Sequence, residues 1–362
     1  GGFLLSVVVV SSFSALVGAE AWNSWGWRLP FLFSIVLLAV SIATRMKLSE
    51  SPVFEKLKKE GGQAANPLKE SFNSPAKIVR LLAGLFGVAA GISVIWYLAH
   101  FQSLYFLQNA LGVEENSALL VVCVGAALNM VMFIAMGWLS DKVGRKTLSI
   151  VGYVGALALL FPTFHWIAGA ANPQLVQAMK QNPVVLAGDC ASPQAQARCA
   201  QLGEMLRERE VTYDKSDMAG VARPTIMVAG AIIDAGDPGK LDQVLRDAGY
   251  DRTQHSLGFA SALKVLAGLA VIGLLSALTY GPAAALLVEL YPASTRYTSL
   301  SIAYNIGTGY FGGFLPLISQ YVVTQTGNPF DGLWYAIAVL VLALFVTIVF
   351  VPETAGKPLR LT

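Results

Sequence analysis

Long runs of apolar residues alternate with shorter polar segments along most of the chain. A helix needs about 20 apolar residues to cross a membrane. Eight runs approach or exceed that length: residues 3–18, 29–47, 80–107, 117–139, 148–170, 257–288, 295–324 and 332–351. The pattern predicts an all-α polytopic membrane protein with about eight spans, of which the first is short.

Two polar stretches interrupt the series. Residues 48–79 are rich in Lys, Glu, Asn, Gly and Pro and are interpreted as a linker, with a short amphipathic surface helix at 53–60. Residues 171–255 differ in kind, because short β-type runs at 184–186 and 225–228 alternate with helix-like stretches around 193–209 and 239–248. An insert of this length without structure would be unusual, so we expect a small α/β domain. Its residues show no catalytic or metal-ligand spacing.

Composition supports the membrane interpretation. The 362 residues are 55% hydrophobic and 13% charged, whereas soluble domains carry about 25% charged residues. The formal net charge is only +3, and the cations cluster at helix ends rather than on one face. Nucleic-acid binding is therefore not expected.

A charged turn at residues 137–147 fixes the expected orientation. Its three cations and one carboxylate cannot lie in hydrocarbon, and its positive excess indicates the cytoplasmic side. Alternation then places 14 of the 25 Lys and Arg residues in cytoplasmic segments and leaves only Arg28 in short outer loops. Nine more lie in the long insert, whose length exempts it from the charge rule. The insert is therefore expected on the extracytoplasmic side.

The same turn resembles the loop signature of the major facilitator superfamily, G-x-L-x-D-[KR]-x-G-R-[KR]. The matching residues are Gly137, Leu139, Asp141, Lys142, Gly144, Arg145 and Lys146. Glu289-Leu290-Tyr291-Pro292 with Arg296, and Pro352-Glu353-Thr354-Ala355-Gly356, resemble cytoplasmic segments of sugar-porter-like members. Residues 25–31 and 50–52 resemble the strings that flank the sixth helix of those members. Among the branches of the superfamily, the chain is most similar to the metabolite:proton symporters.

The resemblance implies a domain organisation and a function. Residues 1–47 would be the last two helices of the N-terminal bundle, 48–79 the linker between bundles, 80–170 helices seven to nine, 171–255 the insert, and 256–362 helices ten to twelve with a cytoplasmic tail. Helices one to four are expected in the intact protein, and the isolated chain is expected not to transport. The implied protein lies in a bacterial inner membrane, takes a small-molecule substrate with protons, and needs no cofactor.

Four charged residues lie at the cytoplasmic ends of neighbouring spans in this reading: Asp141, Arg145, Glu289 and Arg296. Paired there, they could close the inner mouth and open it when substrate binds. The alternative is that they only anchor the helix ends at the membrane surface.

Candidate substrate contacts are fewer. Tyr97 and His100 lie on one helix face by i+3 spacing, and polar groups within a membrane are costly unless they are paired or face water. His100 could instead lie near the outer interface and be solvated. Asn129, Tyr280 and Asn305 are further candidates, although hydrogen bonds between helices explain each of them equally well. No Asp or Glu lies deep in spans seven to twelve, so the main proton-carrying carboxylate is expected on the helices that precede this chain.

The cysteines fit this topology. Cys190 and Cys199 both lie in the insert, where an oxidising periplasm would allow a disulfide; two free thiols are the alternative. Cys123 lies in a span and is interpreted as a packing residue.

The expected function is proton symport of a small organic acid or zwitterion by alternating access. Two alternatives stay open: a proton-antiport exporter, and a membrane-anchored sensor that acts through residues 171–255. An enzyme is not expected, since the chain lacks a HExxH pair, a GxSxG elbow and a P-loop.

Overall fold

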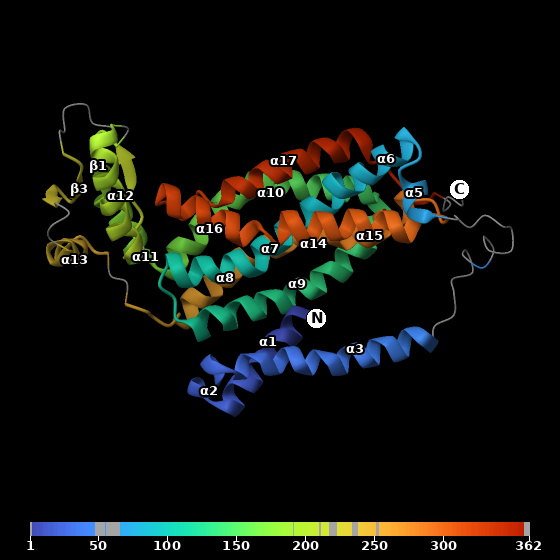
Figure 1. The fold of residues 1–362 in the computed structure, drawn as a ribbon, viewed down its shortest axis with the longest axis horizontal. Coiled ribbons are helices and arrows are strands. Elements are labelled where there is room, and N and C mark those ends of the chain that lie inside the picture. Colours follow the sequence, from blue (N-terminus) through green and yellow to red (C-terminus); the bar gives the residue numbers. More distant parts are fainter. Residues whose placement is uncertain are drawn as a thin grey trace.

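The computed structural model describes residues 2–47, 55, 66–190, 192–209, 211–216, 223–233, 238–250 and 253–357. Long helices run side by side over most of this part, and a small sheet with its own helices lies at one end (Figure 1). Apart from Glu55, the expected surface helix at 53–60 lies outside the described residues.

The first three helices form a group of their own along one flank of the bundle (Figure 1). They are α1 (Gly2–Val17), α2 (Ala19–Ser24) and α3 (Leu29–Lys47), with the 3-10 turn η1 (Gly26–Arg28) between the last two. Neither α1 nor α3 contains a buried residue. Because both are apolar, their exposed side chains suit contact with lipid or with further helices.

The main bundle begins with one long helical span. After α5 (Pro67–Ser71), helical structure is continuous from Pro75 to Ala110. It comprises α6 (Pro75–Leu82), η2 (Ala83–Ala90), α7 (Gly91–Tyr97), η3 (Leu98–Gln102), α8 (Ser103–Tyr105) and η4 (Phe106–Ala110), of which η2, η3 and η4 have π-helical bonding. The helix starts inside the expected 48–79 linker, because Pro75 suits a first helical position, where its missing N–H costs nothing.

The other bundle helices are α9 (Glu115–Val143), α10 (Arg145–Ala171), α14 (Phe259–Leu290) and α17 (Leu333–Phe350). Small residues let α14 approach α9 closely: a Cβ on Gly281 would meet the Gly137 nitrogen at 2.8 Å. Six described helices, including Gly26–Lys47 and Pro75–Ala110, are long and apolar enough to cross a membrane.

The expected single span at 295–324 is wrong in detail. The structure divides it into α15 (Arg296–Ile306), the π-helical η5 (Gly307–Gly312) and α16 (Leu315–Thr326), with a turn at residues 313–314. Four glycines between 307 and 313 weaken helical order there, and Pro316 suits the first turn of a new helix. Mean hydropathy does not register such a break.

The insert is a separate α/β unit with its own apolar core. Its elements are α11 (Pro173–Gln181), β1 (Val185–Ala187), α12 (Pro193–Glu208), β2 (Asp214–Ser216), β3 (Thr225–Val228), β4 (Ala231–Ile233) and α13 (Pro238–Asp247). The strand order is β2-β1-β3-β4, with β1 parallel to β2 and antiparallel to β3. The two expected β-type runs correspond to β1 and β3.

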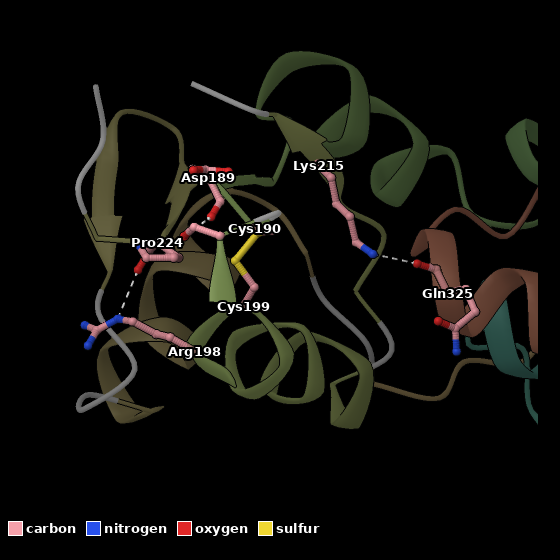
Figure 2. Close-up of a disulfide and its surroundings, with 8 residues drawn as sticks. Asp189, Cys190, Arg198, Cys199, Lys215, Pro224 and Gln325 are labelled. Atoms are coloured by element: carbon pink, nitrogen blue, oxygen red, sulfur yellow. Dashed lines mark hydrogen bonds between the residues drawn. A yellow bond between two sulfur atoms is a disulfide. The ribbon is translucent and has the colours of Figure 1, made fainter. Parts of the chain in front are cut away.

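A disulfide joins Cys190 and Cys199, whose Cα atoms lie 5.8 Å apart, and ties the segment after β1 to α12 (Figure 2). Next to it, Arg198 donates to the Pro224 carbonyl at 3.2 Å. These contacts fix one end of the two inner strands, β1 and β3, against α12.

The insert is anchored to the bundle at two places. Lys215 donates to the Gln325 carbonyl at 2.9 Å (Figure 2), and the Tyr213 N–H to the Gly327 carbonyl at 3.3 Å. At the second place, the backbone of His255 forms two hydrogen bonds with the segment before α9. Its Nε2 atom lies 3.1 Å from the Ala171 carbonyl oxygen. The insert therefore lies at the end of α10 opposite to the 137–147 turn.

Candidate functional site

The turn between α9 and α10 is built on a single non-helical residue. Gly144 separates Val143 from Arg145 with φ 106° and ψ 139°, a conformation that residues with a Cβ rarely adopt. A Cβ at this position would also lie 2.6 Å from a carboxylate oxygen of Glu353. The motif glycine thus serves both the sharp turn and the approach of a distant acidic residue.

Arg145 connects three helix ends through its side chain. Its guanidinium lies 2.5 Å from the Glu289 carboxylate at the end of α14 and 3.2 Å from that of Asp141 in the last turn of α9. The Arg145 and Glu289 side chains are 14% and 16% exposed, whereas Asp141 is 65% exposed. The Arg145–Glu289 pair is therefore the shielded one, in which the attraction is less screened by water.

Glu353 caps the start of α10 from beyond the last helix. Its carboxylate accepts the backbone N–H groups of Arg145 at 2.9 Å and Lys146 at 3.1 Å, and those of Thr354 and Ala355 in its own loop. A carboxylate there also meets the positive end of the helix dipole. Burial alone would raise the pKa of Glu353, but these backbone donors together hold its pKa below the usual value.

The other two cations of the motif, and Arg296 outside it, contact neighbouring groups. Lys146 Nζ donates to the Ile348 carbonyl in α17 at 2.8 Å, and Lys142 Nζ lies 3.8 Å from the centroid of the Trp138 ring. Arg296 donates from Nε to the Tyr291 carbonyl at 3.2 Å. The structure thus joins Asp141, Arg145 and Glu289 directly.

The first pair of candidate substrate contacts lies in an aromatic cluster. His100 is buried, with Nδ1 2.8 Å from the Trp96 carbonyl and its ring stacked on Trp96 at 4.7 Å. Phe3 of α1 contacts His100 edge-on at 5.1 Å. Tyr97 stacks on Phe101 at 5.2 Å. His100 is thus enclosed by rings rather than solvated, and α1 forms part of the enclosure.

The remaining candidates make contacts of other kinds. Asn129 is buried and donates to the Gly273 carbonyl of α14 at 3.1 Å. The Tyr280 hydroxyl lies 2.6 Å from that of Tyr304, which links α14 to α15. Asn305 is exposed and bonds only within its own helix in the described part, to Ser301. The interhelical bond is the contact that the structure shows for Asn129 and Tyr280.

Sequence reasoning missed a second polar junction near the same bundle end. Tyr153 and Thr347 both donate to the Gly87 carbonyl, at 2.9 Å and 2.6 Å. The π-helical bonding of η2 changes which carbonyls remain free, and no local pattern in the sequence signals it. Within the described ranges, no cluster of three His, Cys, Asp or Glu side chains could hold a metal ion.

The long apolar helices and this charged junction define an integral, multi-pass membrane protein. Comparison with known families agrees: the family described as Major Facilitator Superfamily matches residues 1–179, and the one described as Sugar (and other) transporter matches residues 253–362. The chain belongs to the major facilitator superfamily. It is an integral membrane protein of a bacterial inner membrane.

Similar proteins are transporters by name. The inner membrane metabolite transport protein YhjE of Escherichia coli is 24% identical over 92% of this chain and 56% of its own length. The glycine betaine/proline/ectoine/pipecolic acid transporter OusA of Dickeya dadantii is 24% identical over 99% of this chain and 54% of its own length. A proline/betaine transporter of Salmonella typhimurium is 32% identical over 45% of this chain and 34% of its own length. The chain thus spans about half the length of the first two. No solved structure gives a significant match.

Proposed function

We propose that the protein carries a small zwitterionic or anionic organic solute into the cell together with protons, by alternating access. In this proposal residues 137–147 face the cytoplasm and the insert faces outward. The names of the proline and betaine transporters support the solute class, since both solutes are zwitterions. The proton, which none of the relatives' names given above mentions, enters from the resemblance to metabolite:proton symporters.

The observation that carries the proposal is the shielded Arg145–Glu289 pair. It ties the start of α10 to the end of α14. Arg145 Nε and Glu289 Oε2 are buried and have no hydrogen-bond partner in the described part of the chain. A buried pair with unsatisfied atoms is poorly compensated, so a rearrangement that hydrates both ends costs little. Such a contact suits a gate that forms in one state and opens in the other.

Substitutions at Glu289 test this role in the protein encoded by its complete gene. Glu289→Lys sets a like charge against Arg145, and we expect initial uptake of radiolabelled proline or glycine betaine to fall at least about tenfold at unchanged membrane abundance. Glu289→Asp keeps the charge and should retain most uptake. Glu115→Lys makes the same charge change at the opposite, exposed end of α9 and is the matched control. Reduced abundance with normal uptake per molecule would instead identify static anchors.

Proton coupling is tested in the same cells. Uptake should rise with an inward proton gradient and collapse with a protonophore. Uptake that changes with neither the proton gradient nor the protonophore would contradict symport. Accelerated efflux under an inward proton gradient would identify an antiporter.

Deletion of the insert separates transport from sensing. Because His255 lies beside the Ala171 carbonyl, residues 173–254 can be replaced by a short Gly-Ser linker without separating α10 from α14. A transporter should retain measurable uptake after this change. Complete loss of solute response at normal abundance would favour a sensor that acts through the insert.

A further inference from the structure

A pocket lies where the insert meets the bundle. Its bundle wall comprises Gln102, Tyr105 and Asn109, at the end of the Pro75–Ala110 span, and Gln320 of α16. The insert supplies Arg207 from α12 and Thr212 from the segment before β2. The pocket therefore exists only while the two units are docked.

The docking contacts next to the pocket fix its geometry. Tyr213 follows directly after Thr212, and its N–H donates to Gly327, which itself lines the pocket. Gly327 has φ 78°, and a Cβ there would meet the Tyr213 ring at 2.6 Å. Lys215 adds the bond to Gln325. Together these contacts hold the start of β2, and with it the insert wall of the pocket, against the end of α16.

Arg207 is the one charged side chain among the described residues that line the pocket. None of the described residues that line it is an Asp or a Glu. Glu204 holds the guanidinium through Nη2 at 2.7 Å, and Nε donates to the Gly203 carbonyl at 3.3 Å. Nη1 has no partner among the residues that the structure describes, so its two N–H groups are available to a ligand. The Glu204 side chain is 58% exposed and lies on the solvent side.

Gln102 gives an independent indication of a ligand. The residue is only 5% exposed and lines the pocket, and its amide makes no hydrogen bond within the described residues. The amide therefore has both its donor and its acceptor available to water or a ligand in the pocket. Tyr105 and Phe106 supply the apolar part of the wall.

We propose that this pocket binds the carboxylate of a small organic solute, with Arg207 as its charged partner and Gln102 as its neutral partner. Arginine pairs with carboxylates through parallel N–H donors, and the aromatic wall receives the apolar remainder of the solute. That the bound solute is also the transported one rests on the proposed function. The pocket then acts as an outer loading site, where solute collects before the bundle opens to it.

Protection of Arg207 from chemical modification tests binding without requiring transport. The complete protein, purified in detergent, is treated with phenylglyoxal, and modification is read peptide by peptide by mass spectrometry. We expect glycine betaine, proline or acetate to slow modification of Arg207 at least about threefold, whereas exposed Arg246 on α13 serves as internal control. Choline, which has the cationic group of betaine but no carboxylate, should not protect. No protection by any of the three carboxylates, or equal protection by choline, would overturn the proposal.

Variants test the same site without the reagent. Arg207→Gln should weaken binding of the protecting carboxylate about tenfold, as expected for loss of a charge-assisted bond, and should raise KM for uptake with little change in kcat. Gln102→Leu should weaken binding severalfold. Lys180→Gln removes one charge at an exposed position of α11 in the same insert and should change neither value. A normal binding constant in Arg207→Gln, with the fold retained, would also overturn the proposal.

The two proposals fail differently. Protection of Arg207 without any uptake would refute the transport function and leave the pocket standing. Uptake with proton coupling but without protection would leave the transport function standing and refute the pocket.

Discussion

Glu353 and Arg145 are more than 200 positions apart in the sequence and form one local structure. The Glu353 carboxylate satisfies N–H groups at the start of α10 that have no partner within the helix. The Arg145 side chain, which leaves the same turn, reaches Glu289. One short turn therefore fixes the ends of α9, α10 and α14 and the segment after α17.

The first prediction concerns Glu353. Replacement by Gln should lower the free energy of unfolding by about 1 kcal/mol at pH 7, because a neutral amide is a weaker partner for the helix start. Since the folded-state pKa is lowered, the stabilisation is complete above the ordinary Glu pKa of about 4.3. It is lost as pH falls through the folded value.

Thermal unfolding in detergent at several pH values provides the measurement. The difference between wild type and Glu353→Gln should shrink below about pH 4. Glu115→Gln is the control: this exposed carboxylate also lies in the first turn of a helix, α9, but accepts no hydrogen bond from the described residues, so its effect should be smaller. A Glu353 difference that grows on acidification would contradict the capping role.

Among the elements, the broken span α15–η5–α16 depends on glycine for contact. A Cβ on Gly307 would lie 2.5 Å from the Cβ of Ala89 in η2, and one on Gly312 would lie 2.7 Å from that of Ser93 in α7. By contrast, nothing lies within 4 Å of a Cβ on Gly309. The break thus brings α15 and η5 against the π-helical part of the Pro75–Ala110 span.

The second prediction uses that contrast. Gly307→Ala should destabilise the protein by about 1–3 kcal/mol, the usual cost of overpacking, whereas Gly309→Ala should be neutral or slightly stabilising. Thermal unfolding of the two variants in the same detergent measures both effects. Equal effects at the two positions would show that helix propensity, rather than the contact with Ala89, dominates.

This element also shows what the sequence can and cannot predict. Apolar length located the membrane helices, and β-type runs located β1 and β3, because both signals are local. The break near Gly313 went unpredicted, since its glycines are as compatible with a packed straight helix as with a turn. Strand β2 (Asp214–Ser216) is polar and gives no β-type run. Strand β4 (Ala231–Ile233) follows β3 after only two residues and was not separated from it.

The candidate site was likewise predicted only in part. The loop motif named Gly144 and Arg145, and a second segment named Glu353, all on the expected cytoplasmic side. The bond from Glu353 to the start of α10 depends on the path of the whole chain. The pocket at Arg207 and Gln102 was not predicted at all. It joins the insert to the bundle, and its residues have no periodicity that links them.

The third prediction concerns the disulfide of the insert. Loss of the bridge in a Cys190→Ser, Cys199→Ser variant should destabilise the insert by about 2–3 kcal/mol on the chain-entropy model for so short a loop. Limited proteolysis should then cut within 173–254 first. Mass spectrometry with and without reductant establishes the bridge itself, and Cys123→Ser is the control that removes a thiol from α9. Unchanged proteolysis of the double variant would show that the bridge adds no stability.

At the scale of the whole molecule, the two ends of the bundle differ in character. The 137–147 turn, Glu289 and Glu353 gather at one end, and the insert covers part of the other (Figure 1). From the positive-inside rule we expect the first end to face the cytoplasm. The other end, with its sheet and disulfide, is then expected to face the periplasm.

The fourth prediction tests this orientation. In intact cells a membrane-impermeant amine reagent should label Lys180 and Lys240 of the insert, and it should reach Lys142 only after permeabilisation. Peptide mass spectrometry reads all three sites. Labelling of Lys142 from outside, with the insert protected, would invert the topology and remove the basis for an inner gate at Glu289.

The closeness of His255 to Ala171 has a consequence for how such a chain is made and how it changes over time. The whole sheet unit leaves and rejoins the bundle at almost one point, so a ribosome must complete it before α14 can pair with α9 and α10. The same geometry lets the unit be lost, exchanged or redesigned as a cassette while the membrane helices keep their register. Ligand preference at the outer surface can therefore diverge without disturbing the machinery inside the bilayer.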